Sequence, residues 1–77
     1  MSIVFATRCN LETGTKASIE QNKYESCYIL RIMKYGHSIK TGYYSSFNNA
    51  KRAGNRYFKQ YEDNSGSWTK TSYGMNL

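Results

Sequence analysis

The sequence has few of the residues from which metal and redox centres are built. It contains a single histidine, His37, and two cysteines, Cys9 and Cys27, which lack CxxC spacing. A metal site needs several such ligands at short spacing, so none is expected. His37 adjoins Gly36 and is interpreted as a turn residue. The cysteines are interpreted as buried, unreactive thiols, with one cross-strand disulfide as the alternative.

Acidic residues are also scarce. The chain has five Asp and Glu, of which only Glu62 and Asp63 are adjacent. Neighbouring residues on a helix do not face one site, so this pair is interpreted as a solvated helix end. Neither a glycine-rich phosphate loop nor a serine-hydrolase signature is present. We therefore expect no enzymatic activity and no cofactor.

Long apolar runs are absent as well. No stretch approaches the roughly 20 residues of a membrane span, and the N-terminus lacks the basic and apolar regions of a signal peptide. These absences predict a cytoplasmic protein with no membrane partner, in the host cytoplasm if it is encoded by a phage. The 77 residues form one small domain, 1–77, whose core is necessarily limited.

Positive charge, in contrast, is abundant. Eleven Lys and Arg give a net charge of +6 and a pI near 9.5. In a chain this small, such a field attracts polyanions. Eight tyrosines are also present, and tyrosine is enriched at interfaces. The composition predicts binding to DNA or RNA, or to a nucleoprotein complex. The alternative is a basic protein whose charge serves only solubility.

Residues 24–62 predict a β-hairpin followed by one helix. Strands at residues 24–35 and 38–44 would be joined by a turn at Gly36-His37. In that register, Leu30 lies opposite Tyr43. The apolar face toward the core would then comprise Tyr28, Leu30, Ile32, Ile39 and Tyr43. Arg31, Met33 and Lys40 would share the open face. A slip of one residue, which would exchange the two faces, is the alternative.

The period then changes to that of a helix over residues 47–62, capped by Ser46. Apolar and small residues fall on one side, namely Phe47, Ala50, Ala53, Gly54, Tyr57 and Tyr61. The other side carries Lys51 and three further cations. These three are spaced at i, i+4 and i+7, and we call them the basic stripe: Arg52, Arg56 and Lys59. It is predicted to contact phosphates, the alternative being a solvated helix face.

The rest of the chain predicts further strands. Residues 1–10 would form a first strand and residues 15–20 a weaker edge strand, while residues 67–73 would form a last one. Residues 74–77 are expected to fray. The predicted fold class is α+β, a small antiparallel sheet of about three to five strands with one helix on one face. Exposed edge strands leave the oligomeric state open between a monomer and a weak homodimer.

Besides the basic stripe, three residues are candidates for partner contacts. Arg31 and Lys40, in mid-hairpin, are predicted to read base edges, or else to be charges on a solvated sheet face. Trp68 is a candidate for stacking on unpaired bases or for anchoring in a protein pocket. Its alternative role, which we favour for Tyr24, is to cover a sheet edge.

The order of strand, tight turn, strand, aromatic residue, helix cap and alanines resembles the AP2-like, arm-type DNA-binding module of phage and transposon integrases. The matching residues are Tyr44, Ser46, Ala50 and Ala53, after the hairpin at residues 28–43. The resemblance implies a three-stranded sheet whose open face, here with Arg31, Met33 and Lys40, enters the major groove. In size and style the chain also resembles small phage-encoded inhibitors of host defences, such as anti-CRISPR proteins. That likeness implies an inhibitor that docks on an acidic or nucleic-acid-binding protein surface.

Overall fold

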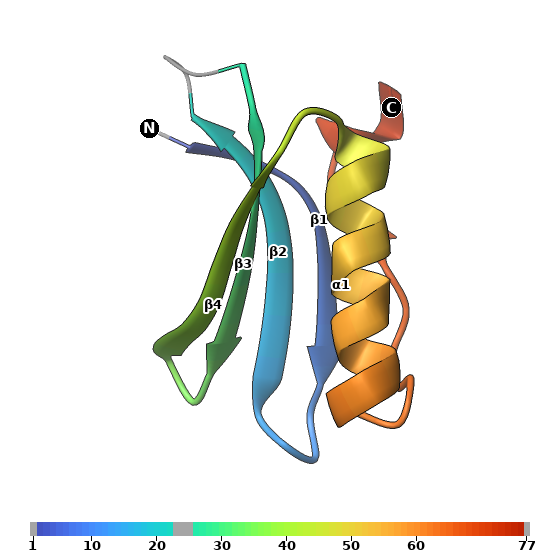
Figure 1. Cartoon of the computed structure of the whole chain (residues 1–77). Helices are drawn as coiled ribbons and strands as arrows, with labels where there is room; N and C mark the ends of the chain where they lie inside the picture. The colour runs from blue at the N-terminus through green and yellow to red at the C-terminus, as the bar shows by residue number, and fades with distance from the viewer. Residues whose placement is uncertain (1, 23–25, 77) are drawn as a thin grey trace.

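The fold is one antiparallel sheet with a single helix on one face. The computed structural model describes residues 2–22 and 26–76, so Tyr24 lies outside the described residues. The elements are β1 (Ser2–Asn10), β2 (Thr15–Asn22), β3 (Tyr28–Lys34), β4 (His37–Tyr44), α1 (Phe47–Tyr61), β5 (Thr69–Lys70) and a 3₁₀ turn, η1 (Gly74–Asn76). The five strands lie in the order β4-β3-β2-β1-β5 (Figure 1). The predicted α+β class is confirmed. Across the described ranges, no helix is long and apolar enough to cross a membrane.

β2 is an inner strand, not the predicted edge strand. It pairs with β1 on one side and with β3 on the other, and its Ala17 and Ile19 are fully buried. Because α1 covers only one face of the sheet, an inner strand needs apolar side chains only at alternate positions. The modest apolar content of residues 15–20 is therefore sufficient. The edges of the sheet are β4 and β5.

The turn between β3 and β4 lies one residue earlier than predicted, at Tyr35-Gly36. Both residues have positive φ, 50° and 82°, as a two-residue type I′ turn requires. Glycine adopts this conformation readily, whereas tyrosine needs support. Tyr35 donates its backbone N–H to the Gly14 carbonyl at 3.1 Å, and its ring covers Gly14 where a Cβ would otherwise lie. The contact with the neighbouring turn therefore fixes this hairpin.

The earlier turn and a bulge between Ile32 and Met33 together change the register of the hairpin and correct two predictions. Next to the turn, Lys34 pairs with His37; beyond the bulge, Ile32 pairs with Lys40 and Leu30 with Gly42, so the bulge exchanges the faces of the rest of β4. Leu30 and Ile32 are fully buried as predicted, but Ile39 and Tyr43 point away from the core and are 48% and 65% exposed. The alternative register, slipped by one residue, is the observed one from Lys40 to Tyr44.

Arg31 and Lys40 consequently lie on opposite faces of the sheet. Arg31 pairs with Thr41 and faces the open side, whereas Lys40 pairs with the buried Ile32 and faces α1. Paired residues of an antiparallel ladder share a face, so the predicted Arg31–Lys40 surface is wrong.

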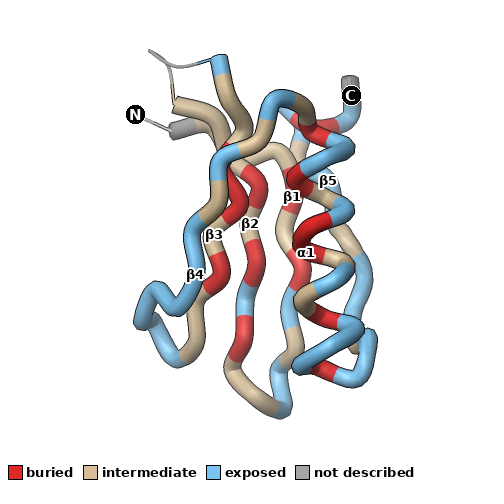
Figure 2. The backbone as a smooth tube through the Cα atoms, in the orientation of Figure 1, coloured by how far each residue is buried: buried red, intermediate tan, exposed pale blue. Residues whose placement is uncertain are grey.

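α1 begins as predicted, with the Ser46 hydroxyl accepting the Asn49 N–H at 3.1 Å. It ends at Tyr61, one residue before the predicted end. The core lies between its inner side and the sheet (Figure 2) and comprises Ala6, Ala17, Ile19, Leu30, Ile32, Phe47, Ala50, Ala53 and Phe58. Phe58 is fully buried although it was not predicted. Tyr61 was predicted on the buried side, but it is 61% exposed because its ring packs on Tyr57 and not on the sheet.

Gly54 lets Trp68 approach the helix closely. A Cβ at Gly54 would lie only 2.6 Å from Cζ2 of Trp68. The Trp68 indole donates from Nε1 to Oδ1 of Asn55 at 2.7 Å, and its ring packs against the core. This contact accounts for a glycine that costs about 1 kcal/mol of helix propensity relative to alanine. Trp68 thus covers the core and is not an exposed anchor.

A buried arginine ties β1 to the segment that follows α1. Arg8 is 6% exposed, and its guanidinium stacks 4.5 Å from the centroid of Phe58. It donates from Nε to the Ser65 carbonyl at 2.9 Å, from Nη1 to Asn55 Oδ1 at 2.9 Å and from Nη2 to Asn64 Oδ1 at 3.2 Å. All these acceptors are neutral. Burial lowers the pKa of Arg8 from its usual value because the charged form is desolvated.

The C-terminal segment returns along β1 and ends in a 3₁₀ turn. β5 is only two residues long and pairs with β1. Thr71 then donates its backbone N–H to the Phe5 carbonyl at 2.9 Å, and Gly74 is buried in η1. Gly74 and Met75 donate their backbone N–H groups to the Thr71 carbonyl, and the expected fraying of the end of the chain stays a prediction. Leu77 lies outside the described residues.

Candidate nucleic-acid interface

The basic stripe lies on the solvent side of α1. Arg52, Arg56 and Lys59 are exposed, and Lys51 beside them is half-buried. No ion pair joins any of these side chains to another residue within 2–22 or 26–76. α1 itself contains no Asp or Glu. The charge of the stripe is therefore not neutralised locally, which distinguishes it from a helix face laced with salt bridges.

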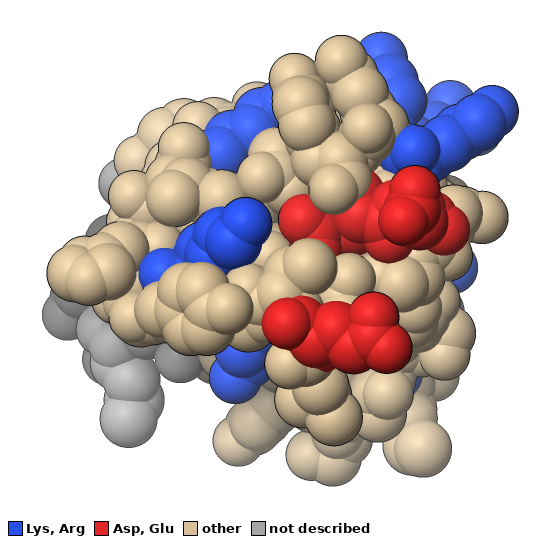
Figure 3. Space-filling view, turned by 90° about the horizontal axis from the view of Figure 1, so that it is seen from below, with Lys and Arg blue, Asp and Glu red and all other residues tan. Residues whose placement is uncertain are grey.

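The carboxylates lie elsewhere. Glu20 forms an ion pair with Arg31, with 3.4 Å between Oε1 and Nη2. Glu12 and Asp63 are exposed where β1 turns into β2 and where α1 ends. Figure 3 shows acidic side chains gathered at this end of the molecule. Glu12 and Asp63 thus border the end of the helix, whereas Glu20 lies on β2, so the basic side of α1 stays open.

Glu62 is buried and not the solvated residue that was predicted. It is 5% exposed, and its Oε1 accepts hydrogen bonds from Asn10 Nδ2, at 3.1 Å, and from the Thr13 hydroxyl. The β1–β2 turn packs against the end of α1 and supplies both donors. Glu62 therefore joins two turns and is not available to a ligand.

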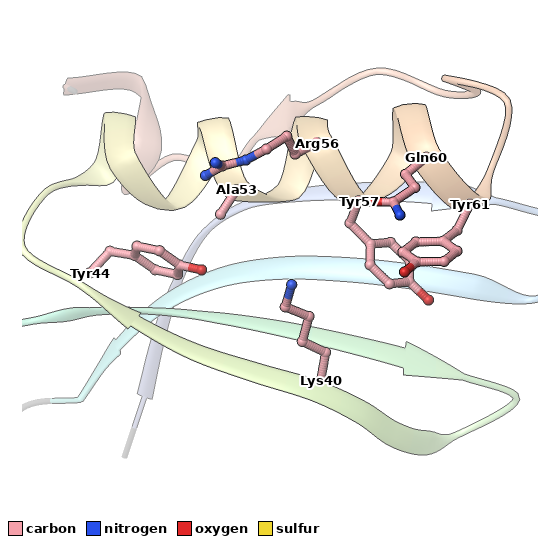
Figure 4. A pocket seen from close by; sticks show the side chains of 7 residues that line it. All are labelled: Lys40, Tyr44, Ala53, Arg56, Tyr57, Gln60 and Tyr61. Atoms are coloured by element: carbon pink, nitrogen blue, oxygen red, sulfur yellow. The ribbon is translucent and has the colours of Figure 1, made fainter.

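A cleft of about 280 Å³ separates α1 from the edge strand β4 (Figure 4). We call it the tyrosine cleft; its lining comprises Lys40, Tyr44, Ala53, Arg56, Tyr57, Gln60 and Tyr61. The positions of β4 that face α1 do not fill this space with apolar side chains. One is Gly42, which leaves room for the Tyr44 ring to fold over it; a Cβ there would lie 2.8 Å from that ring.

Two cations from different elements line the tyrosine cleft. Figure 4 shows Lys40 extending from β4 toward α1, with Arg56 on the helix wall. Lys40 Nζ lies 5.9 Å from the centroid of the Tyr57 ring, within the range of a cation–π contact. No carboxylate lines the cleft. The site is therefore suited to an anion.

The phenol rings give the cleft a second property. Tyr57 and Tyr61 lie 4.8 Å apart at an interplanar angle of 41°. Burial, and then the nearby Glu62 and Tyr61, raise the pKa of Tyr57 above its usual value. The arrangement can bind an anion and stack a flat ring beside it.

Of the predicted contact residues, the structure brings only Lys40 and Arg56 together at the cleft. Arg52 and Lys59 extend the charge along the outer side of α1, with Lys51 at its border. Arg31 is on the other face of the sheet. Sequence reasoning missed the role of Tyr44 and Tyr61. The sequence features that could have indicated them are the position of Tyr44 at the end of the strand before the helix, and the spacing of Tyr61, which follows Tyr57 by one helical turn.

The remaining candidates for chemistry do not form a site. Among the residues that the structure describes, no three His, Cys, Asp or Glu side chains gather so as to hold a metal ion. Cys9 and Cys27 form no disulfide. Cys9 was predicted to be buried but is exposed, because it lies on the open face of β1 opposite Lys16.

No protein-family model, curated protein or solved structure matches the chain significantly. The resemblance to the AP2-like module therefore stays a prediction.

Proposed function

We propose that the protein binds nucleic acid through the basic stripe and the tyrosine cleft. The observation that carries the proposal is that Lys40 and Arg56, from two elements, line one cleft that no carboxylate lines. Arg52 and Lys59 continue the same unpaired charge along α1. Backbone phosphates are the polyanion that such a surface fits best.

This proposal places the contact on the helix side of the sheet. The resemblance to the AP2-like module implies the open face instead, with Arg31 as a reader of bases. Arg31, however, is engaged by Glu20, which would have to be displaced. Phosphate contacts from α1 provide affinity and register but little sequence readout. We therefore propose a binder of low sequence specificity that acts in the cytoplasm as a monomer or weak homodimer, as a phage or mobile-element protein would.

The proposal predicts a steep dependence of affinity on salt. Lys40, Arg52, Arg56 and Lys59 allow about four phosphate contacts, so log K should fall with log[salt] with a slope of about −3.6 for duplex DNA and about −2.8 for single strands. Fluorescence polarisation of labelled oligonucleotides across a salt series measures this slope. An affinity that does not change with salt would contradict the proposal.

The same surface favours an acidic or nucleic-acid-binding protein as the second candidate partner, as an anti-CRISPR-like inhibitor would have. The supporting observation is that the exposed Tyr61 and Arg56 line the same cleft, since tyrosine and arginine are residues that dominate protein interfaces. Absence of binding to any free oligonucleotide, together with recovery of an acidic partner that Arg56→Glu abolishes, would favour this candidate.

A further inference from the structure

We infer that the tyrosine cleft selects single-stranded nucleic acid, DNA or RNA, by holding one backbone phosphate between Lys40 and Arg56 and stacking the adjoining base on Tyr61. This inference rests on the proposed function and names the ligand of the same site.

The cations are placed to hold a phosphate from two sides. Lys40 extends from β4 toward α1 and lies near the Tyr57 ring, whereas Arg56 lies along the helix wall of the cleft with its guanidinium toward the Tyr44 side (Figure 4). Neither side chain forms an ion pair within the described ranges. A guanidinium and an ammonium on opposite walls can therefore share one phosphate without first losing an internal partner.

Tyr61 is placed to stack a base beside that phosphate. Its ring packs against Tyr57 and is nevertheless 61% exposed, so ring surface remains for a second flat partner. Every base has a π-face, and stacking on aromatic side chains is the usual contact of proteins that bind single strands without sequence preference. Tyr61 is therefore the stacking platform of the site.

The shape of the cleft favours an unpaired strand over a duplex. The cleft has a volume of about 280 Å³ and lies between the helix and β4, the outermost strand of the sheet. It is therefore concave and open along the β4 edge. In a duplex, the bases are stacked inside and cannot enter such a cleft unless one is flipped out, which has an energetic cost. A single strand presents unstacked bases without that cost.

The test compares ligands that share phosphates but differ in bases. Affinities of the wild-type protein are measured by fluorescence polarisation for oligo(dT), oligo(rU), an abasic DNA strand and a DNA duplex, each of about 12 nucleotides or base pairs. We expect oligo(dT), oligo(rU) or both to bind at least about fivefold more tightly than the abasic strand. The two pyrimidine strands show whether DNA or RNA is the preferred source.

Substitutions then locate the stacking contact. Tyr61→Ala should remove the preference for oligo(dT) over the abasic strand, and Tyr61→Phe should retain it, because stacking needs the ring and not the hydroxyl. Tyr73→Ala is the matched control, since Tyr73 is also 61% exposed but lies beyond β5 at the other edge of the sheet. It should leave the preference unchanged.

The outcomes separate this inference from the proposed function. Equal, salt-dependent affinity for all four ligands would retain nucleic-acid binding and overturn selection by the cleft. A preference for bases that survives Tyr61→Ala would overturn Tyr61 as the platform. Absence of salt-dependent binding to every ligand would overturn both.

Discussion

Replacing Arg8 with alanine should lower the free energy of unfolding by about 3 kcal/mol and the melting temperature by roughly 15 °C. The substitution removes three hydrogen bonds and the cation–π contact with Phe58. It also leaves the half-buried Ser65 carbonyl without its Arg8 donor, whereas Asn55 Oδ1 keeps the hydrogen bond from the Trp68 indole. Unsatisfied buried acceptors are costly, and a domain of this size has a total stability of roughly 4–12 kcal/mol.

The effect should be specific to the buried position. Lys16→Ala removes an equal charge from an exposed site on β2, where no hydrogen bond or ion pair is lost, and should change stability by less than about 0.5 kcal/mol. Thermal unfolding followed by circular dichroism measures both variants. If Arg8→Ala unfolds within a few degrees of Lys16→Ala, then Arg8 does not hold the segment after α1 to β1.

Reversing two charges of the basic stripe should abolish most of the affinity for nucleic acid. For Arg52→Glu/Arg56→Glu, we expect a decrease of about 100-fold in affinity at roughly 0.1 M salt, and a salt slope that is shallower by about 1.8 for duplex DNA. Each lost phosphate contact removes one released counterion, and each new carboxylate repels the backbone. Both residues are exposed on α1, so the fold should remain intact.

The matched control changes the net charge equally but elsewhere. Lys16→Glu/Lys34→Glu alters β2 and the end of β3, outside the basic stripe and the cleft. Both double variants take the chain from +6 to +2 because each replaces two cations with two anions. If binding depends only on the overall field, then the two variants will lose affinity equally, and the assignment of the contact to α1 will be wrong.

The sequence was sufficient to predict the elements of the fold, since α1 and its cap follow from local periodicity and from the Ser46 hydroxyl. It was not sufficient for the hairpin register. That register depends on Tyr35 in a left-handed conformation supported by Gly14, a contact between two turns that are distant in sequence, and on the bulge between Ile32 and Met33, which exchanges the faces of β4. The inner position of β2 was missed for a similar reason, because pairing partners are tertiary information.

The candidate site was predictable to the same limited extent. The basic stripe follows from spacing along α1 alone, and the structure leaves it exposed. The tyrosine cleft could not be predicted, because it exists only when Lys40 and Gly42 face the helix. A register shifted by one residue would have placed Tyr43 in that space and closed it.

The most direct test of the binding surface is an NMR titration of the ¹⁵N-labelled protein with an unlabelled single-stranded oligonucleotide. The proposal predicts that the largest amide shifts fall on residues 51–61 of α1 and residues 40–44 of β4, and that they disappear at high salt. Shifts centred instead on Ser18 and Arg31, on the open face of the sheet, or no shifts at all, would contradict the account.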